Sequence, residues 1–173
     1  MPLTAVEPGA LRAVLGRFAT GVAVVTAFGP DGGPLGMTVN SFTSVSLDPP
    51  LVLYCANRAS RLFPAFTQAR AFAVNILAES QDEVSRRFAR QGLDRFGALR
   101  YEAGEAGAPV LADSIAVLEC TTESVVPAGD HALVLGRVSA AAAVAGAAAP
   151  LVFYDGAYRR LDDRHADWWT AFS

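Results

Sequence analysis

Apolar residues recur with a helical period near the start of the chain. Thr4-x-x-Glu7 has the form of a capping box, and Pro8 suits a first helical turn. Four apolar residues then fall at positions i, i+3, i+4 and i+7: Leu11, Val14, Leu15 and Phe18. This spacing predicts an amphipathic helix of roughly three turns that ends at Gly21.

After Gly21 the apolar residues gather in short runs between turn residues, which is typical of strands. The predicted strands occupy 21–28, two segments within 36–60, then 71–77, 114–126, 131–144 and two short segments within 151–161. We expect 114–126 and 131–144 to form a hairpin through the four residues 127–130. Asp155-Gly156 marks a tight turn in the last segment.

Two further helices and several connections complete the pattern. Ser60 and Pro64 are placed to start a short helix, and Ser80-x-x-Glu83 has the form of a second capping box. The remaining segments indicate connections: a turn at 29–34, a loop at 92–107 and an alanine-rich stretch at 140–149.

Strands that are mostly adjacent in sequence, without regular alternation with helices, argue against a doubly wound parallel sheet. The pattern predicts a mainly β fold with flanking helices, either an antiparallel barrel or a sandwich. With 173 residues, one domain over 1–173 is the expectation. The polar and aromatic tail at about 162–173 leaves two alternatives open, a frayed end or a segment that packs on a partner chain outside the barrel.

Composition narrows the class of protein further. A hydrophobic content of 52% with 18% charged residues provides a core and excludes disorder. The net charge is −3 and the basic residues are scattered, so neither nucleic acid nor an anionic membrane is an expected partner. No apolar run reaches the ~18 residues of a membrane span, and 19–28 lacks the pattern of a signal peptide, so we expect a cytoplasmic protein. Cys55 and Cys120 fit two buried free thiols.

Several kinds of chemistry lack their usual motifs. With only His131 and His165, the sequence predicts no metal site. No G-x-G-x-x-G follows a strand, so a nicotinamide cofactor would not be held by a Rossmann unit. A phosphate-loop lysine motif and G-x-S-x-G are also missing, which leaves no support for a hydrolase.

The stretch 36–60 combines polar side chains with a buried strand. In an extended chain one of its faces would carry Thr38, Asn40, Phe42, Ser44 and Ser46. This face is compatible with a half-exposed strand in water or with the wall of a polar pocket. A flavin requires such a pocket, because its ring edge needs amide and backbone partners and its phosphate needs hydroxyls, N–H groups and a cation. Asn57-Arg58-Ala59-Ser60, at the expected start of a helix, could supply the phosphate partners.

Several segments, in order along the chain, resemble the short-chain flavin reductase family, the reductase components of two-component flavin-dependent monooxygenases. They are FATGVAVVTA (18–27), GMTVNSFTSVSLDPPLVLYCANRAS (36–60), FAVNIL (72–77), SRRFA (85–89), GDH (129–131) and LVFYDGAY (151–158). The resemblance implies a split antiparallel β-barrel (the FMN-binding split barrel), usually as a homodimer. It also implies that FMN or FAD is reduced by NADH or NADPH and is then passed to a separate monooxygenase.

The resemblance further implies the residues of the site. The implied cofactor-binding residues are Met37, Thr38, Val39, Asn40, Ser41, Cys55, Ala56, Asn57, Arg58, Ser60, Arg87, Tyr154 and Tyr158. His131 is implied as the catalytic residue, where the nicotinamide would stack. Arg58 stands where the family more often has lysine, and Leu62 stands where a threonine is common, so one phosphate hydroxyl is missing.

Within this set the implied roles differ. The segment 37–41 would contact the ring edge and ribityl chain, and 55–58 with Ser60 would hold the phosphate. Arg87 would reach the cofactor, and Tyr154 or Tyr158 would border the nicotinamide. From the residues alone, Arg87 is equally compatible with a solvated helix charge, and the two tyrosines with packing.

Two rival functions stay open. The protein could be a flavoprotein that keeps FMN tightly bound and acts as an oxidase or reductase on another substrate. It could also be a non-catalytic flavin- or heme-binding module of the same barrel type.

Overall fold

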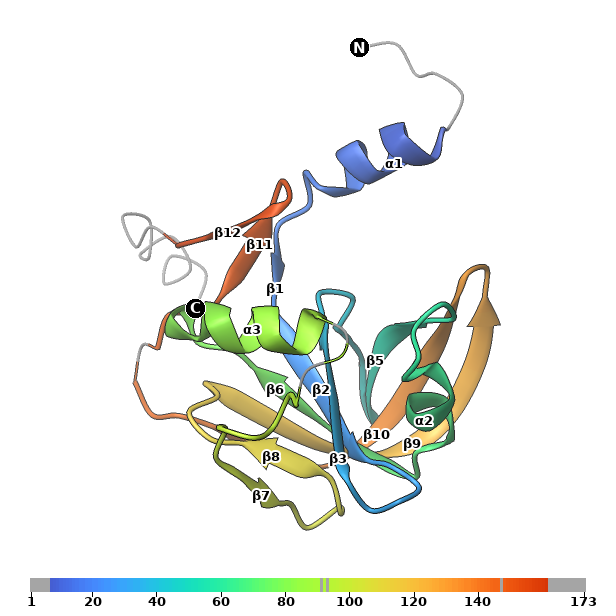
Figure 1. Cartoon of the computed structure of the whole chain (residues 1–173), viewed down its shortest axis with the longest axis vertical. Helices are drawn as coiled ribbons and strands as arrows, with labels where there is room; N and C mark the ends of the chain where they lie inside the picture. Colours follow the sequence, from blue (N-terminus) through green and yellow to red (C-terminus); the bar gives the residue numbers. More distant parts are fainter. Residues whose placement is uncertain (1–6, 91, 93, 147, 162–173) are drawn as a thin grey trace.

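A seven-stranded antiparallel sheet dominates the computed structural model, which describes residues 7–90, 92, 94–146 and 148–161 (Figure 1). Its strands, in spatial order, are β3 (Pro34–Val39), β2 (Ala23–Phe28), β6 (Ala71–Ile76), β9 (Ala116–Ala128), β10 (His131–Ala143), β5 (Pro50–Asn57) and β4 (Thr43–Leu47). The helices are α1 (Pro8–Leu15), α2 (Phe63–Gln68), α3 (Asp82–Ala89) and a short 3-10 turn at Glu79–Gln81. None of the helices in the described residues has the length and apolar character needed to cross a bilayer.

Two smaller sheets flank the large one. In the first, β1 (Thr20–Gly21) pairs with β11 (Val152–Tyr154), which pairs with β12 (Ala157–Arg159). In the second, β7 (Tyr101–Ala103) pairs with β8 (Pro109–Leu111). The side-chain amide of Asn75 joins β8 to β2. Its Oδ1 accepts from the Leu111 amide at 2.8 Å, and its Nδ2 donates to the Val24 carbonyl at 3.0 Å.

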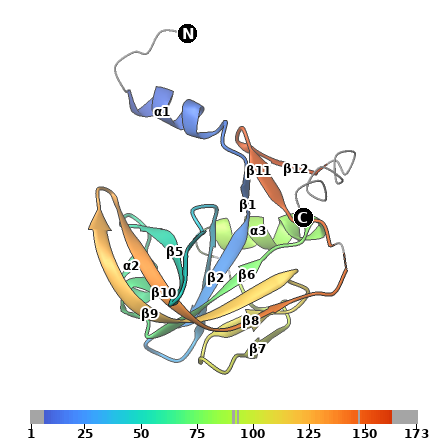
Figure 2. The ribbon, with the colours of Figure 1, turned by 180° about the vertical axis from the view of Figure 1, so that it is seen from behind.

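The large sheet curls until its two edges come close together. Its edge strands are β3 and β4, yet only residues 40–42 separate them along the chain. An extended chain from Val39 to Thr43 spans at most about 14 Å, so the edges lie near each other without pairing. Viewed from behind, the long β9–β10 hairpin wraps around the body (Figure 2). The sheet is therefore a split barrel, which confirms the predicted fold class.

Both faces of β2 are buried, which explains its continuous apolar run. One face carries Ala23 and Val25 into a cluster with the aromatic rings of Tyr54 and Phe72. The other face carries Val24 into a second cluster beneath α3. Side chains that alternate along β2 therefore pack into two cores, one inside the barrel and one between the barrel and α3.

Three sequence predictions about strands and connections are wrong in detail. The segment 36–47 is not one alternating strand, because the chain leaves the sheet at 40–42 and crosses from one edge to the other. The β9–β10 turn contains two residues instead of four, with Gly129 at φ 59°. The loop at 92–107 contains β7. The strand predicted at 131–144 is confirmed as β10, which runs to Ala143 because the long β9 offers its alanines ladder partners, so the alanine-rich stretch forms a connection only beyond that residue.

The helices occur near the predicted places, but their bounds differ, and α1 ends at Leu15 instead of Gly21. Glu7 is the N-cap of α1 without a side-chain bond, and Thr4 lies outside the described residues. The Ser80–Glu83 capping box is wrong, because α3 starts at Asp82 after Gln81. The Asp155-Gly156 turn is confirmed, with both residues at positive φ.

The hydroxyl of Tyr54 provides a test of the core. Its side chain is fully buried, and the hydroxyl has no hydrogen-bond partner among the described residues. We expect Tyr54→Phe to raise the free energy of unfolding by about 1 kcal/mol, because a desolvated and unbonded hydroxyl is removed. Tyr158→Phe is the matched control and should lower it by about 1 kcal/mol, since that hydroxyl lies 2.7 Å from Ser85 Oγ. Urea denaturation measures both; a destabilised Tyr54→Phe variant would contradict this account.

Candidate functional site

A cleft of about 400 Å³ opens where the two edges of the split barrel approach each other. The end of β3, the link after it, β5, the turn before α2, the end of α3 and the start of β10 all contribute to it. The lining residues are Met37, Thr38, Val39, Asn40, Ser41, Cys55, Asn57, Ala59, Ser60, Phe88, Ala89, Arg95 and His131. Segments far apart in the sequence thus meet at the split.

Two side-chain hydrogen bonds hold the walls of the cleft. Beyond Leu53, β5 has no pairing with β4, and the Cys55 amide donates instead to Ser41 Oγ at 3.0 Å. Thr38 Oγ1 donates to the Ser85 carbonyl at 2.6 Å, which joins β3 to α3. Five consecutive residues, 37–41, border the cleft. In one flat strand only every second side chain would point to the same side. All five border it because the chain turns away from the sheet there.

The turn at 57–60 differs from the predicted phosphate cradle. Asn57 Oδ1 accepts from the Ala59 amide at 2.7 Å, and the Asn57 carbonyl accepts from the Ser60 amide at 3.0 Å. The helix α2 begins only at Phe63 and has six residues. Backbone N–H groups of the turn are thus engaged inside the chain. The Ser60 hydroxyl accepts from the Leu62 amide at 3.2 Å and can still donate its proton to a ligand.

Arg95 is the permanent cation of the cleft. Its guanidinium donates to the Gly36 carbonyl at 2.7 Å and to the Arg90 carbonyl at 2.6 Å. Partial burial lowers the pKa of Arg95, which reflects a charge that is desolvated. No aspartate or glutamate is among the described residues that line the cleft. The site is therefore suited to an anion.

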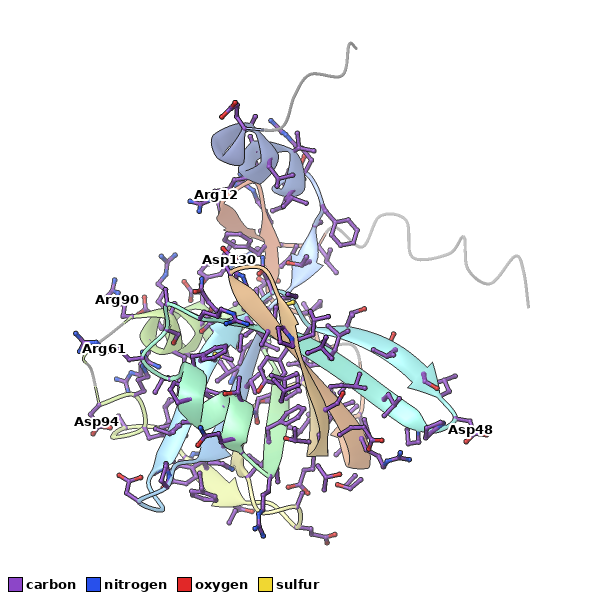
Figure 3. All side chains as sticks on the ribbon, turned by 90° about the vertical axis from the view of Figure 1, so that its right-hand side faces the viewer. Arg12, Asp48, Arg61, Arg90, Asp94 and Asp130 are labelled. Atoms are coloured by element: carbon purple, nitrogen blue, oxygen red, sulfur yellow. The ribbon has the colours of Figure 1, made fainter. Side chains whose placement is uncertain are left out.

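His131 is the histidine that lines the cleft. It opens β10 opposite Asn57, and its Nδ1 lies 2.8 Å from Asp130 Oδ1. This hydrogen bond and the charge of the imidazole lower the pKa of Asp130. An ionised carboxylate only accepts, so Nδ1 carries the proton and Nε2 is the ring nitrogen available to a ligand. Figure 3 labels Asp130 at the tip of the β9–β10 hairpin.

The structure brings most of the residues predicted for the site together. Nine of them border the cleft: Met37, Thr38, Val39, Asn40, Ser41, Cys55, Asn57, Ser60 and His131. Five do not: Ala56, Arg58, Arg87, Tyr154 and Tyr158. Ala56 points into the core because it alternates with Cys55 and Asn57 along β5.

The other four lie outside the cleft for separate reasons. The Arg58 guanidinium lies 5.9 Å from the centre of the Phe63 ring and is exposed, and Arg87 is half-buried on α3. Tyr154 interacts with Arg17 instead, and this interaction raises the pKa of that arginine. Tyr158 contacts Ser85 instead, so it acts on the cleft only through the residue that holds Thr38.

Sequence reasoning missed Ala59, Phe88, Ala89 and Arg95. Phe88 follows from the helical period of α3, but its place at the cleft depends on Gly36, where an added Cβ would lie 2.3 Å from the Phe88 ring. Arg95 lies in the segment interpreted as a loop, and no periodicity or motif marks it. Only the fold carries it beside Ser60.

The sequence matches the family model described as "Flavin reductase like domain" over residues 15–162. It is 49% identical over 134 residues to a probable flavin reductase of Rhizobium meliloti, covering 78% of this chain and 43% of that protein. It is 47% identical over 150 residues to the FMN reductase (NADH) SmoA of Agrobacterium fabrum, covering 87% and 84%. The chain thus spans less than half the length of the first relative.

A solved structure agrees with the fold. The nitrilotriacetate monooxygenase component B homologue of Mycobacterium thermoresistibile superposes with a TM-score of 0.86 at 37% identity, covering 91% of this chain and 88% of that one. A family match over nearly the whole described chain, together with this likeness, leads to one conclusion. The chain belongs to the flavin reductase like domain family.

Proposed function

We propose that this protein is an NAD(P)H-dependent flavin reductase that reduces FMN or FAD and supplies the reduced flavin to a partner monooxygenase. The observation that carries the proposal is the cleft at the split of the barrel, which combines hydroxyl and amide side chains with Arg95 and has no carboxylate among its described lining residues. The name of the Agrobacterium relative supports NADH as the reductant, and the name of the Mycobacterium homologue supports a monooxygenase partner.

The cleft residues fit a flavin. Asn40 and Asn57 offer amide donors and acceptors of the kind a flavin ring edge requires. Ser60 and Arg95 provide a hydroxyl donor and a desolvated cation for a phosphate. The volume of about 400 Å³ lies in the range of small-molecule sites.

The side chains of the cleft would position the two rings and close the cleft around them, and they need not transfer protons. A flavin held in the cleft would supply the hydride-accepting chemistry, so the protein mainly has to hold the flavin and nicotinamide rings in contact. Ser41 fixes the link 40–42 against β5, and Phe88 closes one side of the cleft. Asp130 holds the His131 imidazole in one tautomer at the rim.

We expect His131→Ala to lower the turnover of reduced nicotinamide on the order of tenfold, because the second ring loses its positioning surface. The dissociation constant of the flavin should change by less than about twofold, since the phosphate and ring-edge contacts are made elsewhere. Steady-state kinetics and flavin titration measure the two quantities. Asp130→Asn, which keeps the ring, should show a smaller loss; unchanged turnover of His131→Ala would remove this residue from the site.

One titration tests the proposed function against its two rivals. NADH oxidation by the purified protein should rise with added free FMN or FAD. A yellow protein that turns over without added flavin would instead support a tightly bound FMN acting on another substrate. A yellow protein inert to NADH and NADPH would support the non-catalytic binding module.

We further propose a cytoplasmic homodimer in which a second copy covers the apolar face of α1. This helix stands away from the sheet (Figure 1), and Val14, Leu15 and Phe18 are 67%, 61% and 77% exposed. Exposed apolar clusters of this kind usually mark an interface.

Light scattering coupled to size-exclusion chromatography should therefore give a molar mass twice that of the monomer. Phe18→Glu should shift the mass toward the monomer, because a carboxylate would be buried without a partner. Val144→Glu, at another exposed apolar position, is the matched control and should remain dimeric. A monomeric wild-type protein at micromolar concentration would contradict the proposal.

A further inference from the structure

The helix α3 is tied to two separate parts of the molecule through one residue, Ser85. Its carbonyl accepts from Thr38 Oγ1 of β3 at 2.6 Å, and its hydroxyl lies 2.7 Å from the Tyr158 hydroxyl of β12. In Figure 1 the helix lies between the β11–β12 hairpin and the large sheet. Ser85 is fully buried, so neither bond can be exchanged for a bond to water. The positions of β3 and β12 are therefore linked across α3.

Tyr158 is itself held firmly at its end of this link. Its ring meets the Phe153 ring at a centroid distance of 5.9 Å, and both side chains pack against the core cluster beneath α3. The Arg86 guanidinium lies 4.9 Å from the centre of the Tyr158 ring, within the range of a cation–π interaction. The strand β12 pairs with β11, which pairs with β1. The Tyr158 hydroxyl thus offers Ser85 a partner in a fixed position.

The other end of the link lies in the wall of the cleft. Thr38 borders the cleft, and so does Phe88, which follows Ser85 by about one turn of α3. Thr38 has one hydroxyl proton and donates it to the Ser85 carbonyl, so toward the cleft its Oγ1 can only accept. The orientation of this acceptor depends on where α3 holds the carbonyl.

We infer that Tyr158 is a positioning residue of the flavin site, which fixes Thr38 on the cleft wall through Ser85. This inference rests on the proposed function, which places the flavin in this cleft. Tyr158 is not among the described residues that line the cleft, so its effect on a ligand is indirect. Binding groups have to be held to within about 0.5 Å by the residues behind them. The phosphate contact proposed at Arg95 belongs to another segment.

Two flavins that differ only in the phosphate test this assignment. Riboflavin and FMN are titrated into the protein without nicotinamide, and flavin fluorescence gives both dissociation constants. Tyr158→Phe should raise both by about three- to tenfold, because it disturbs the wall of the cleft and leaves the phosphate contact in place. Ser85→Ala should have the same effect, since it removes the other half of the same hydrogen bond.

Ser114→Ala is the matched control for lost stability. The Ser114 hydroxyl is buried and donates to the Leu111 carbonyl at 3.2 Å, so its loss should destabilise the fold about as much as Tyr158→Phe. Ser114 is not among the described residues that line the cleft. Both dissociation constants should therefore stay within about twofold in this variant.

A double-mutant cycle tests whether Tyr158 acts through Thr38. Thr38→Val removes the hydroxyl that Ser85 holds, so little remains for Tyr158 to position. The effects of Tyr158→Phe and Thr38→Val on riboflavin affinity should therefore be non-additive, by at least about threefold. Additive effects would overturn the inference, because Tyr158 would then act on the flavin by another route.

Unchanged dissociation constants in Tyr158→Phe would also overturn it, as would equal losses in Ser114→Ala, which would attribute the effect to lost stability. A protein that shows the expected losses but oxidises no NADH would contradict the proposed reaction alone. One that reduces flavin with NADH, and whose Tyr158→Phe variant binds both flavins normally, would contradict only this inference. A wild-type protein that binds neither flavin would contradict both.

Discussion

Replacing Gly136 with alanine should lower the free energy of unfolding by about 3 kcal/mol, because the added methyl group has no space. A Cβ at this position would lie 2.3 Å from Cζ and 2.7 Å from Cε1 of Phe72, and 3.0 Å from Cβ of Cys120. Phe72 is fully buried and packs edge to face on Tyr54 at 5.1 Å, so its ring cannot move aside. Urea denaturation of the variant measures the loss.

A double-mutant cycle ties this loss to the Phe72 ring. Phe72→Leu removes the ring atoms that the methyl group would meet, so the double variant should lose at least about 1 kcal/mol less than the sum of the single changes. Gly21→Ala is the matched control, because nothing lies within 4 Å of an added Cβ on that strand glycine. It should be neutral or stabilise by up to about 1 kcal/mol. Strict additivity in the cycle would show that Gly136 is required for another reason.

The local elements of the fold could be predicted from the sequence because their signals are local. The buried run of β2, the Asp155-Gly156 turn and the helical period of α3 each depend on neighbours a few residues away. The missed elements depend on distant partners. β7 and β8 are strands only because they pair with each other.

The candidate site shows the same division. Residues 37–41, Cys55, Asn57 and Ser60 could be identified because one continuous stretch carries both walls, and the resemblance covers that stretch. Arg58 was the expected cation because it stands in this stretch. Its guanidinium instead rests near the Phe63 ring and 3.4 Å from the His131 carbonyl. Arg95 belongs to a separate segment, and no property of its own neighbourhood indicates that it lines the same cleft as Ser60.

We therefore expect replacement of Arg95, but not of Arg58, to weaken binding of the flavin phosphate. Arg95→Met should raise the dissociation constant of FMN by roughly ten- to a hundredfold, because a charge-assisted hydrogen bond contributes about 1.5–3 kcal/mol. Arg58→Met should raise it by less than about threefold, since an exposed cation outside the cleft is screened by water. Equilibrium titration with FMN measures both.

Riboflavin separates the charge of Arg95 from its structural role. Arg95 also donates to the carbonyls of Gly36 and Arg90, so its loss could distort the cleft as a whole. Riboflavin has no phosphate, and its dissociation constant should stay within about twofold in Arg95→Met if the cleft keeps its shape. Arg95→Lys should recover part of the FMN affinity, because it retains the charge without the planar fork. A large loss for FMN in Arg58→Met with none in Arg95→Met would restore Arg58 as the phosphate ligand, and it would mean that the turn at 57–60 rearranges when the flavin binds.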